Sequence, residues 1–165
     1  MVTNIHVRDF HASLSQAGTL LDSLSSKDDK LWPYDRWSPM KFDQPLGIGA
    51  AGGHGMIRYI VEEFRPGHFV SFRFTEPRGF IGTHAFDLRE VSPGVVRIRH
   101  VIRMKLKGAA RIWWPLVIRW LHDALIEDAF DKAEAYISSQ PMKQRTLSLW
   151  VRLLRHLFKR KRTRR

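Results

Sequence analysis

The sequence contains no cysteine, so disulfide bonds and thiolate chemistry are excluded. It also lacks an apolar run close to the roughly 20 residues that a helix needs to cross a bilayer. The best candidate, 112–121, is too short and contains Arg119. The first ten residues, MVTNIHVRDF, have no charged start followed by an apolar segment, so we expect no signal peptide and a cytoplasmic location.

Acidic residues are missing from the last part of the chain, and this divides the sequence into two regions. Residues 140–165 carry ten Lys or Arg and no Asp or Glu, whereas residues 1–139 carry 18 basic and 16 acidic residues. The net charge of +12 therefore comes mainly from the C-terminal tail. We expect one globular domain over 1–139, large enough for a real core, and a basic tail over 140–165.

Four runs of alternating apolar and polar residues predict half-buried antiparallel strands. They span 55–64, 69–75, 80–90 and 94–106. On the third run His84 lies on the apolar face beside Phe86, and on the fourth His100 lies beside Ile98. Titratable rings are unusual in such positions, so the pattern predicts two histidines that point into the interior.

Short turns between these strands also predict their pairing. A three-residue turn between the last two strands places His84 opposite His100. A two-residue turn between the first two places Tyr59 opposite Phe72. Turns two residues longer or shorter would keep the inward faces and change the partners. The other faces are charged, and we expect them to be solvated.

The N-terminal third predicts a short strand around Ile5 and Val7, then a helix capped by Ser13. Residues 25–45 contain three prolines and predict a lid-like loop, and residues 46–50 predict a second strand.

After Gly108 the apolar spacing predicts a helix to about Ser138, with a kink or a first turn at Pro115. A second amphipathic helix is predicted from about Leu147. Titratable residues crowd one part of the long helix, and we expect them to form a solvated face that meets arginines: His122, Asp123, Glu127, Asp128 and Asp131. Three tryptophans beside them would line or cover a cavity: Trp113, Trp114 and Trp120.

Three stretches carry a resemblance to a known family: GAAGGHGMIRY at 49–59, GFIGTH at 79–84 and LHDALIEDAFDKAE at 121–134. Together with the element order they resemble the START-like superfamily, also called the polyketide cyclase/dehydrase and lipid-transport or SRPBCC group, over roughly residues 3–138. The resemblance implies an α+β helix-grip fold, in which a curved antiparallel sheet wraps around a long helix. Members of the group bind lipids, sterols, plant hormones or aromatic polyketides, and some are enzymes.

The implied cavity would lie between the sheet and the long helix. We expect His84 and His100 to contact the polar end of a small hydrophobic or amphipathic ligand, because a neutral imidazole offers one donor and one acceptor. Apolar walls would come from Tyr59, Phe72, Phe74, Phe86, Ile98 and Leu125. His54, in a glycine-rich turn, would lie near the mouth, and Trp32 and Trp37 would belong to the lid.

No metal or cofactor is expected. His54 could join His84 and His100 as a third metal ligand, but no tight ligand spacing supports a metal site. The glycines at 47, 49 and 52 match a dinucleotide fingerprint, yet a strand follows them where that fingerprint needs a helix. These glycines favour a tight turn or a bulge instead.

Reversible ligand binding is the function that the sequence favours, and alternatives stay open. Both histidines could be purely structural. An inward histidine could serve as acid or base in an enzyme of the cyclase/aromatase kind. The protein could also be an adaptor that acts through its tail.

The tail combines an apolar stripe with basic residues, a pattern typical of helices that lie on an anionic membrane. The membrane or anion contacts would come from Arg145, Trp150, Arg152, Arg155, Lys159 and Arg160. Nucleic acid is a weaker possibility, because binding to phosphates does not need the apolar stripe. A helix docked on the domain itself is the third alternative.

Overall fold

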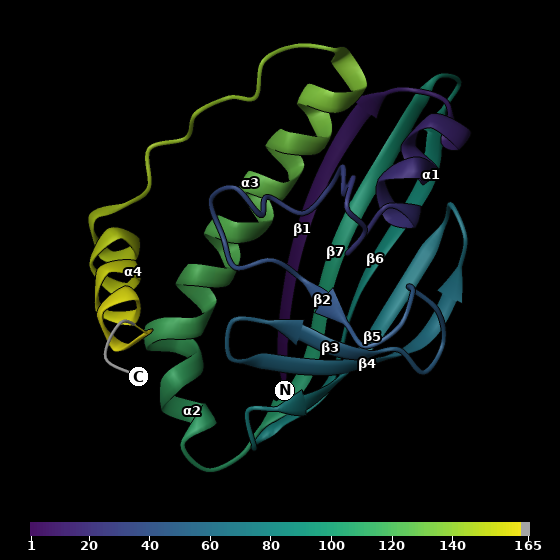
Figure 1. Ribbon diagram of the computed structural model, residues 1–165. Coiled ribbons are helices and arrows are strands. Elements are labelled where there is room, and N and C mark those ends of the chain that lie inside the picture. Colours follow the sequence, from purple (N-terminus) through teal and green to yellow (C-terminus); the bar gives the residue numbers. More distant parts are fainter. Residues whose placement is uncertain (163–165) are drawn as a thin grey trace.

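A seven-stranded antiparallel sheet curves around one long helix (Figure 1). The computed structural model describes the backbone of residues 1–162 and the side chains of residues 1–158. The strand order across the sheet is β1-β7-β6-β5-β4-β3-β2. The strands are β1 (Val2–His11), β2 (Lys41–Phe42), β3 (Ala51–His54), β4 (Ile57–Arg65), β5 (Phe69–Glu76), β6 (Phe80–Ser92) and β7 (Val95–Leu106). The predicted α+β helix-grip class is confirmed.

The long helical stretch after Gly108 is continuous but not uniform. It consists of α2 (Ala110–Trp113), the π-helical η1 (Trp114–Ile118) and α3 (Arg119–Ser138). Proline has no backbone N–H to donate, so Pro115 interrupts the regular series of backbone hydrogen bonds of the helix. The wider π-helical turn lies at this position.

Two further helices flank this core. The first is α1 (Leu14–Asp22), whose N-cap Ser13 accepts a hydrogen bond from the backbone N–H of Gln16, as the sequence predicts. The second is α4 (Leu149–Arg162) in the tail, which stands beside the first turns of the long helical stretch (Figure 1).

The inward faces of β6 and β7 are confirmed, but the predicted partners are wrong. His84 and His100 are only 6% and 2% exposed. His84 pairs with Ile102 and His100 pairs with Phe86, each two residues from the predicted register. The hairpin closes with a tight turn and a bulge after Glu90, which a three-residue turn does not describe.

The β4–β5 hairpin shows the same shift. Tyr59 pairs with Phe74 instead of Phe72. The turn spans 66–68 instead of 65–66, which moves the strand partners by three residues, and the bulge between Val61 and Glu63 takes one residue back. The apolar faces stay inward because the combined shift is two residues.

The face of β1 is reversed relative to the usual rule that apolar residues point inward. Ile5 and Val7 are about half exposed, on the outer side of the sheet. Asn4, His6 and Arg8 face α3, where each of them bonds a carboxylate of that helix. Strand β1 therefore presents a polar stripe to the interior.

One smaller prediction is wrong, and the predicted solvation of the outer face fails at Asp87. Residues 46–50 form turns instead of a strand, and Gly49 takes a positive φ of 88° there. On the outer face Asp87 is only 8% exposed, because Arg99 and Arg89 cover its carboxylate.

Apolar side chains pack between the sheet, α1 and α3. The main cluster includes Leu20, Phe72, Phe86, Ile98 and Phe130, all with almost no exposure. A second cluster lies where the long helical stretch begins and contains Phe74, Phe80, Ile102, Met104, Ala110 and Trp114. Within residues 1–162, no helix is long and apolar enough to cross a membrane.

Gly82, two residues before His84, lets β6 approach β7 closely. A Cβ atom there would lie 2.1 Å from the carbonyl oxygen of Arg103, and the residue has a φ of +151°. We expect Gly82→Ala to lower the free energy of unfolding by about 2–4 kcal/mol in urea denaturation. Gly47→Ala is the control, because its Cβ would meet only one atom, at 3.8 Å. Equal stability of the two variants would contradict this account.

Candidate functional site

A row of aromatic rings, five of them histidines, crosses the interior between the sheet and α3. The rings come from β3, β4, β6, β7, α3 and β1, which converge there from distant parts of the chain. Successive ring centroids are 4.7–6.0 Å apart, in the order His54, Tyr59, His84, His100, His122 and His6. The two histidines predicted from the strand pattern are thus the centre of a larger group.

Several polar atoms of this row are buried without a partner. His84 and His100 share one hydrogen bond of 3.4 Å between Nδ1 and Nε2. The remaining ring nitrogens of these two residues, the Nε2 atom of His122 and the hydroxyl of Tyr59 have no hydrogen-bond partner within the described residues. Buried polar groups normally have hydrogen-bond partners. Four buried polar atoms without partners in one row therefore indicate a place where a further polar group could form hydrogen bonds.

Burial keeps the interior histidines uncharged. Removal from water lowers the pKa of His84 and of His100 well below 6.5 and lowers the pKa of His54 to about 3. Burial also lowers the pKa of His122, partly opposed by its hydrogen bond to Asp123. At neutral pH these rings are therefore neutral, each with one donor and one acceptor nitrogen.

The last ring of the row, His6, is cationic. Burial alone would lower the pKa of His6, but hydrogen bonds and charge from Asp123 and Glu127 outweigh burial and raise the pKa to about 9. The two ring nitrogens lie 3.1 Å from Asp123 and 2.9 Å from Glu127. Arg8 extends this pairing to Glu127, Asp131 and Glu134. Carboxylates of α3 therefore do meet an arginine of the sheet, as predicted. The predicted solvation is wrong for Asp128 and Asp131, which are buried.

One group in the described part of the chain has the composition of a metal site. Ligand atoms of His6, His122 and Asp123 lie within 4.8 Å of one another. One oxygen of Asp123 already accepts hydrogen bonds from Asn4, His6 and His122. Because these bonds account for the arrangement, we assign no metal to it.

Three of the predicted wall residues contact rings of the row. Phe72 and Phe74 stack on the ring of His84 at 4.7 and 4.9 Å, and Phe86 contacts the ring of His100 at 4.5 Å. Ile98 and Leu125 are buried in the main apolar cluster. Their role as ligand contacts remains a prediction.

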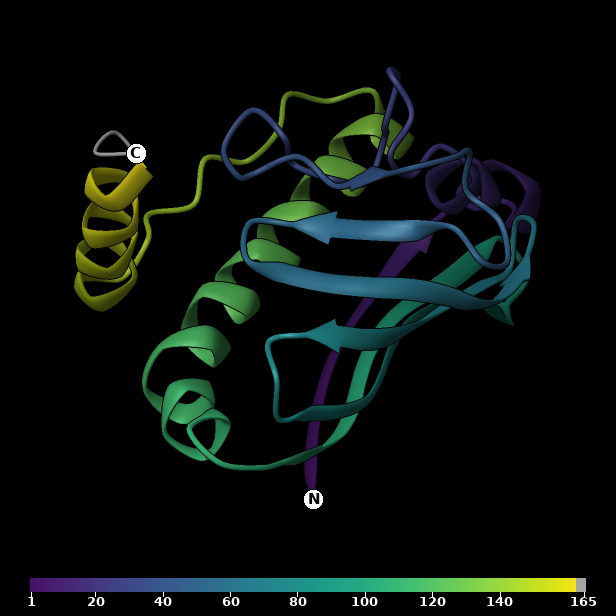
Figure 2. The same cartoon turned by 60° about the horizontal axis from the view of Figure 1, so that its bottom comes forward.

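The predicted lid segment crosses beside α3 and is fastened to it (Figure 2). Trp37 donates a hydrogen bond of 2.7 Å to Asp128, and Lys132 donates one of 2.7 Å to the carbonyl of Trp32. Trp32 is buried, and its ring lies 4.7 Å from the ring of His54. This segment therefore covers the His54 end of the row.

Two surface hollows of about 300 and 350 Å³ are found in the described residues. Neither is lined by any of the six rings. One lies beside Asp87 and Arg99 on the sheet, and the other lies beside Trp32 and Met40 on the lid segment. The interior row is thus covered in this conformation.

The tail residues divide into two groups. Arg145 pairs with Asp131, and Arg155 donates to the carbonyl of Arg36 and lies over the ring of Trp37, so both are held against the domain. Arg152 is exposed, and Trp150 is partly exposed. The side chains of Lys159 and Arg160 lie outside the described residues.

Sequence reasoning missed the roles of His6, His122 and Asp123. For His6 the sequence signal was weak, because the alternation of apolar and polar residues shows that a strand has two faces without showing which face is inward. Of the three tryptophans of the long helical stretch, Trp114 is buried, whereas Trp113 and Trp120 are 47% exposed and do not line the interior.

No family model matches the sequence, and no curated protein sequence matches it. Solved structures do match. A protein from Thermobifida fusca aligns with a TM-score of 0.62 over 88% of this chain and 99% of its own, at 11% identity. CalU16 from Micromonospora echinospora aligns with a TM-score of 0.57 over 96% of this chain and 84% of its own, at 12% identity. A norcoclaurine synthase point mutant from Thalictrum, in complex with a transition-state analogue, aligns at 0.60 over 84% and 96%, with 14% identity.

These neighbours and this chain share one helix-grip architecture. At such low identities the likeness shows the fold alone, because one fold hosts many activities.

The pKa shifts give a testable pH dependence of stability. The pKa of His6 is about 9 in the folded protein, above its ordinary value of 6.5, so its stabilising effect is complete below pH 6.5 and is lost as pH rises toward 9. The effect amounts to about 3 kcal/mol at most. The lowered pKa values of His54, His84 and His100 affect stability in acid. Below pH 6.5 these histidines bind protons in the unfolded chain but not in the folded protein, so stability also falls as pH drops.

Urea midpoints measured from pH 5 to pH 9 should therefore peak near neutrality. In His6→Gln the decline toward pH 9 should flatten, while the decline toward pH 5 stays. An alkaline decline that is as steep in the variant as in the parent protein would show that His6 does not carry this effect.

Proposed function

We propose that this protein reversibly binds a small amphipathic molecule between the sheet and α3. The observation that carries the proposal is the set of four buried polar atoms without partners, on Tyr59, His84, His100 and His122. A polar end of the ligand would bond these atoms, and its apolar part would contact Phe72 and the other buried wall residues.

The energetic argument rests on the cost of an unmade hydrogen bond. Each buried donor or acceptor without a partner costs about 1–3 kcal/mol. A ligand that supplies the missing partners recovers part of this cost, whereas an apolar molecule of the same size does not. The site therefore favours a ligand with a hydroxyl, carbonyl or similar uncharged group over a pure hydrocarbon.

Binding fits the row better than acid–base catalysis does. A general base works best when its pKa lies near the working pH. Burial lowers the pKa values of His84 and His100 far from this range, so both are weak bases at neutral pH. An enzyme of the cyclase kind remains the second candidate, because one structural neighbour is a synthase. Loss of turnover in His84→Ala or His100→Ala with binding retained would support the enzyme.

Entry of a ligand would require the lid segment to move. The row is covered in this conformation, and the covering residues are tied to α3 through Asp128 and Lys132. A hollow of about 350 Å³ already borders the lid segment beside Trp32. We therefore place the entrance at the His54 end of the row.

Tyr59→Phe tests the ligand site directly. The substitution removes only the buried hydroxyl, so the free protein should become more stable, with a melting temperature about 2–4 °C higher. The same change should lower ligand retention, because one bonding group is lost. Native mass spectrometry of the purified protein would measure the bound molecule, and calorimetry would measure the melting temperature.

Tyr34→Phe is the matched control, because that ring is 48% exposed and lies outside the row. It should change neither quantity. A Tyr59→Phe protein that retains as much bound molecule as the parent, or a parent that carries none and is not stabilised by amphipathic probes, would refute the proposal.

Asp128→Asn tests the lid. Asp128 is fully buried and binds both Arg36 and Trp37, so loss of its charge should loosen the lid segment. We expect faster uptake of the uncharged fluorescent probe Nile red in stopped-flow measurements, together with a stability loss of about 2 kcal/mol. Unchanged uptake kinetics would place the entrance elsewhere.

A further inference from the structure

A large apolar surface lies outside the helix–sheet interior, on two elements that are distant in sequence. It comprises eight side chains that are 44–80% exposed. Four belong to the beginning of the long helical stretch and four to α4: Ile112, Trp113, Leu116, Trp120, Leu149, Trp150, Leu153 and Leu157. We call this set the outer apolar face. Exposed apolar patches of this extent usually mark an interaction site.

Helix α4 uses only part of its apolar stripe for packing. Val151 and Leu154 are buried against the rest of the protein. Leu149, Leu153 and Leu157 follow each other at four-residue spacing and point away from that contact. A helix that needed only to dock on its own domain would not require this second apolar row.

A hydrogen bond joins the two parts of the outer apolar face, and a second one lies within the long helical stretch. The indole N–H of Trp150 donates to the carbonyl of Leu116 at 3.0 Å, and that of Trp120 donates to the carbonyl of Pro115 at 3.0 Å. Both acceptors belong to the π-helical turn. Because the polar ends of both indoles are bonded internally, their exposed parts are apolar.

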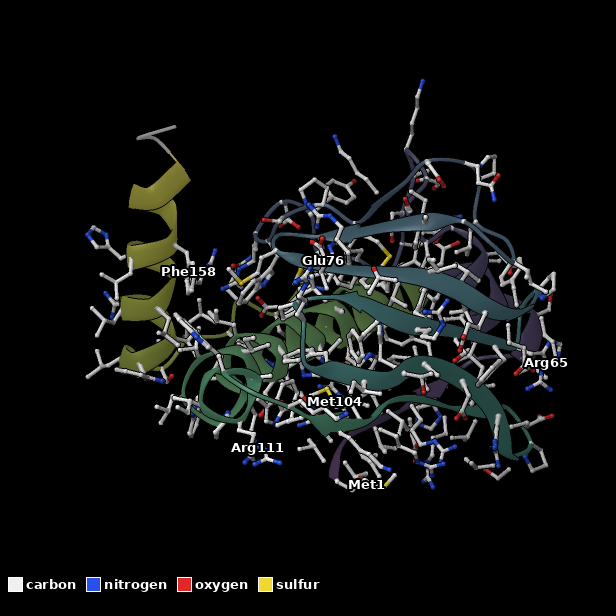
Figure 3. All side chains as sticks on the ribbon, turned by 90° about the horizontal axis from the view of Figure 1, so that it is seen from below. Met1, Arg65, Glu76, Met104, Arg111 and Phe158 are labelled. Carbon is white, nitrogen blue, oxygen red and sulfur yellow. The ribbon has the colours of Figure 1, made fainter. Side chains whose placement is uncertain are left out.

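Positive charge borders this surface. Arg111, Arg119 and Arg152 are exposed, and Figure 3 shows Arg111 on the outside of the first helical turns. The sequence after Phe158 adds six Lys or Arg, and the whole of 140–165 has no acidic residue. Apolar residues with tryptophan beside a basic cluster match the chemistry of an anionic lipid surface.

We propose that the outer apolar face docks the protein on an anionic lipid bilayer. The leucine row of α4 and the side chains of Ile112 and Leu116 enter the headgroup boundary, and the basic residues bind lipid phosphates. The absence of acidic residues from the tail favours lipid over a protein partner of mixed charge. The proposal does not depend on the interior ligand.

Vesicle sedimentation of the full-length protein tests the proposal. We expect binding to vesicles of phosphatidylcholine mixed with phosphatidylserine, weaker binding to phosphatidylcholine alone, and weakening by salt. Leu149→Ser/Leu153→Ser should reduce vesicle binding about tenfold or more, because two apolar side chains that would enter the bilayer are replaced by polar ones. Both residues are exposed in the free protein, so its circular dichroism should not change.

Ile81→Ser/Val91→Ser is the matched control, since these side chains are also about half exposed but lie on β6, away from the outer apolar face. It should bind vesicles like the parent. Three results would overturn the proposal: no binding to either vesicle, binding that survives the leucine substitutions, or a dimer in size exclusion that these substitutions dissociate. The last result would assign the face to a second copy of the chain.

Discussion

The placement of α3 on the sheet depends on charge pairing between this helix and the first strand. Apolar packing holds most of α3, but at β1 the contacts are ionic and polar. His6 and Arg8 face Asp123, Glu127 and their neighbours on the helix. A half-buried network of this kind is strongly destabilised when one partner is removed, because the other charges are left without compensation. The helix is therefore fixed in register along β1 as well as held against the sheet.

The same pairing shapes the electrostatics of the interior. His6 is kept cationic by the carboxylates, and its ring lies 5.6 Å from the neutral ring of His122. The positive charge makes protonation of His122 and His100 less favourable, in addition to their burial. The row therefore runs from a charged, hydrogen-bonded ring at β1 through neutral rings to His54 under the lid segment, and the polar atoms without hydrogen-bond partners lie on Tyr59, His84, His100 and His122, between these two ends. A polar ligand group would meet uncharged donors and acceptors, not an ion.

Which residues face inward on β4–β7 could be predicted from the sequence, because the two-residue period survives changes in turn length. The pairing of His84 could not, since a bulge after Glu90 leaves no mark in the alternation. Strand β1 is longer than the sequence predicted. Its inward polar residues are explained only by the carboxylates of α3, to which they bond. The histidine row could not be predicted as a whole for the same reason, because its members approach one another through tertiary contacts that local sequence patterns do not encode.

The position of β1 in the sheet has a consequence for synthesis on the ribosome. Its ladder partner is β7, so Val2 pairs with Met104 and His11 pairs with Val95. Its inward side chains also need the carboxylates of α3, which follow later still. Strand β1 is therefore synthesised long before its partners, and translation must pass Glu134 before β1 can complete its contacts. Until then β7 offers an open edge to other extended chains, and the outward arginines on that strand are well placed to discourage such pairing.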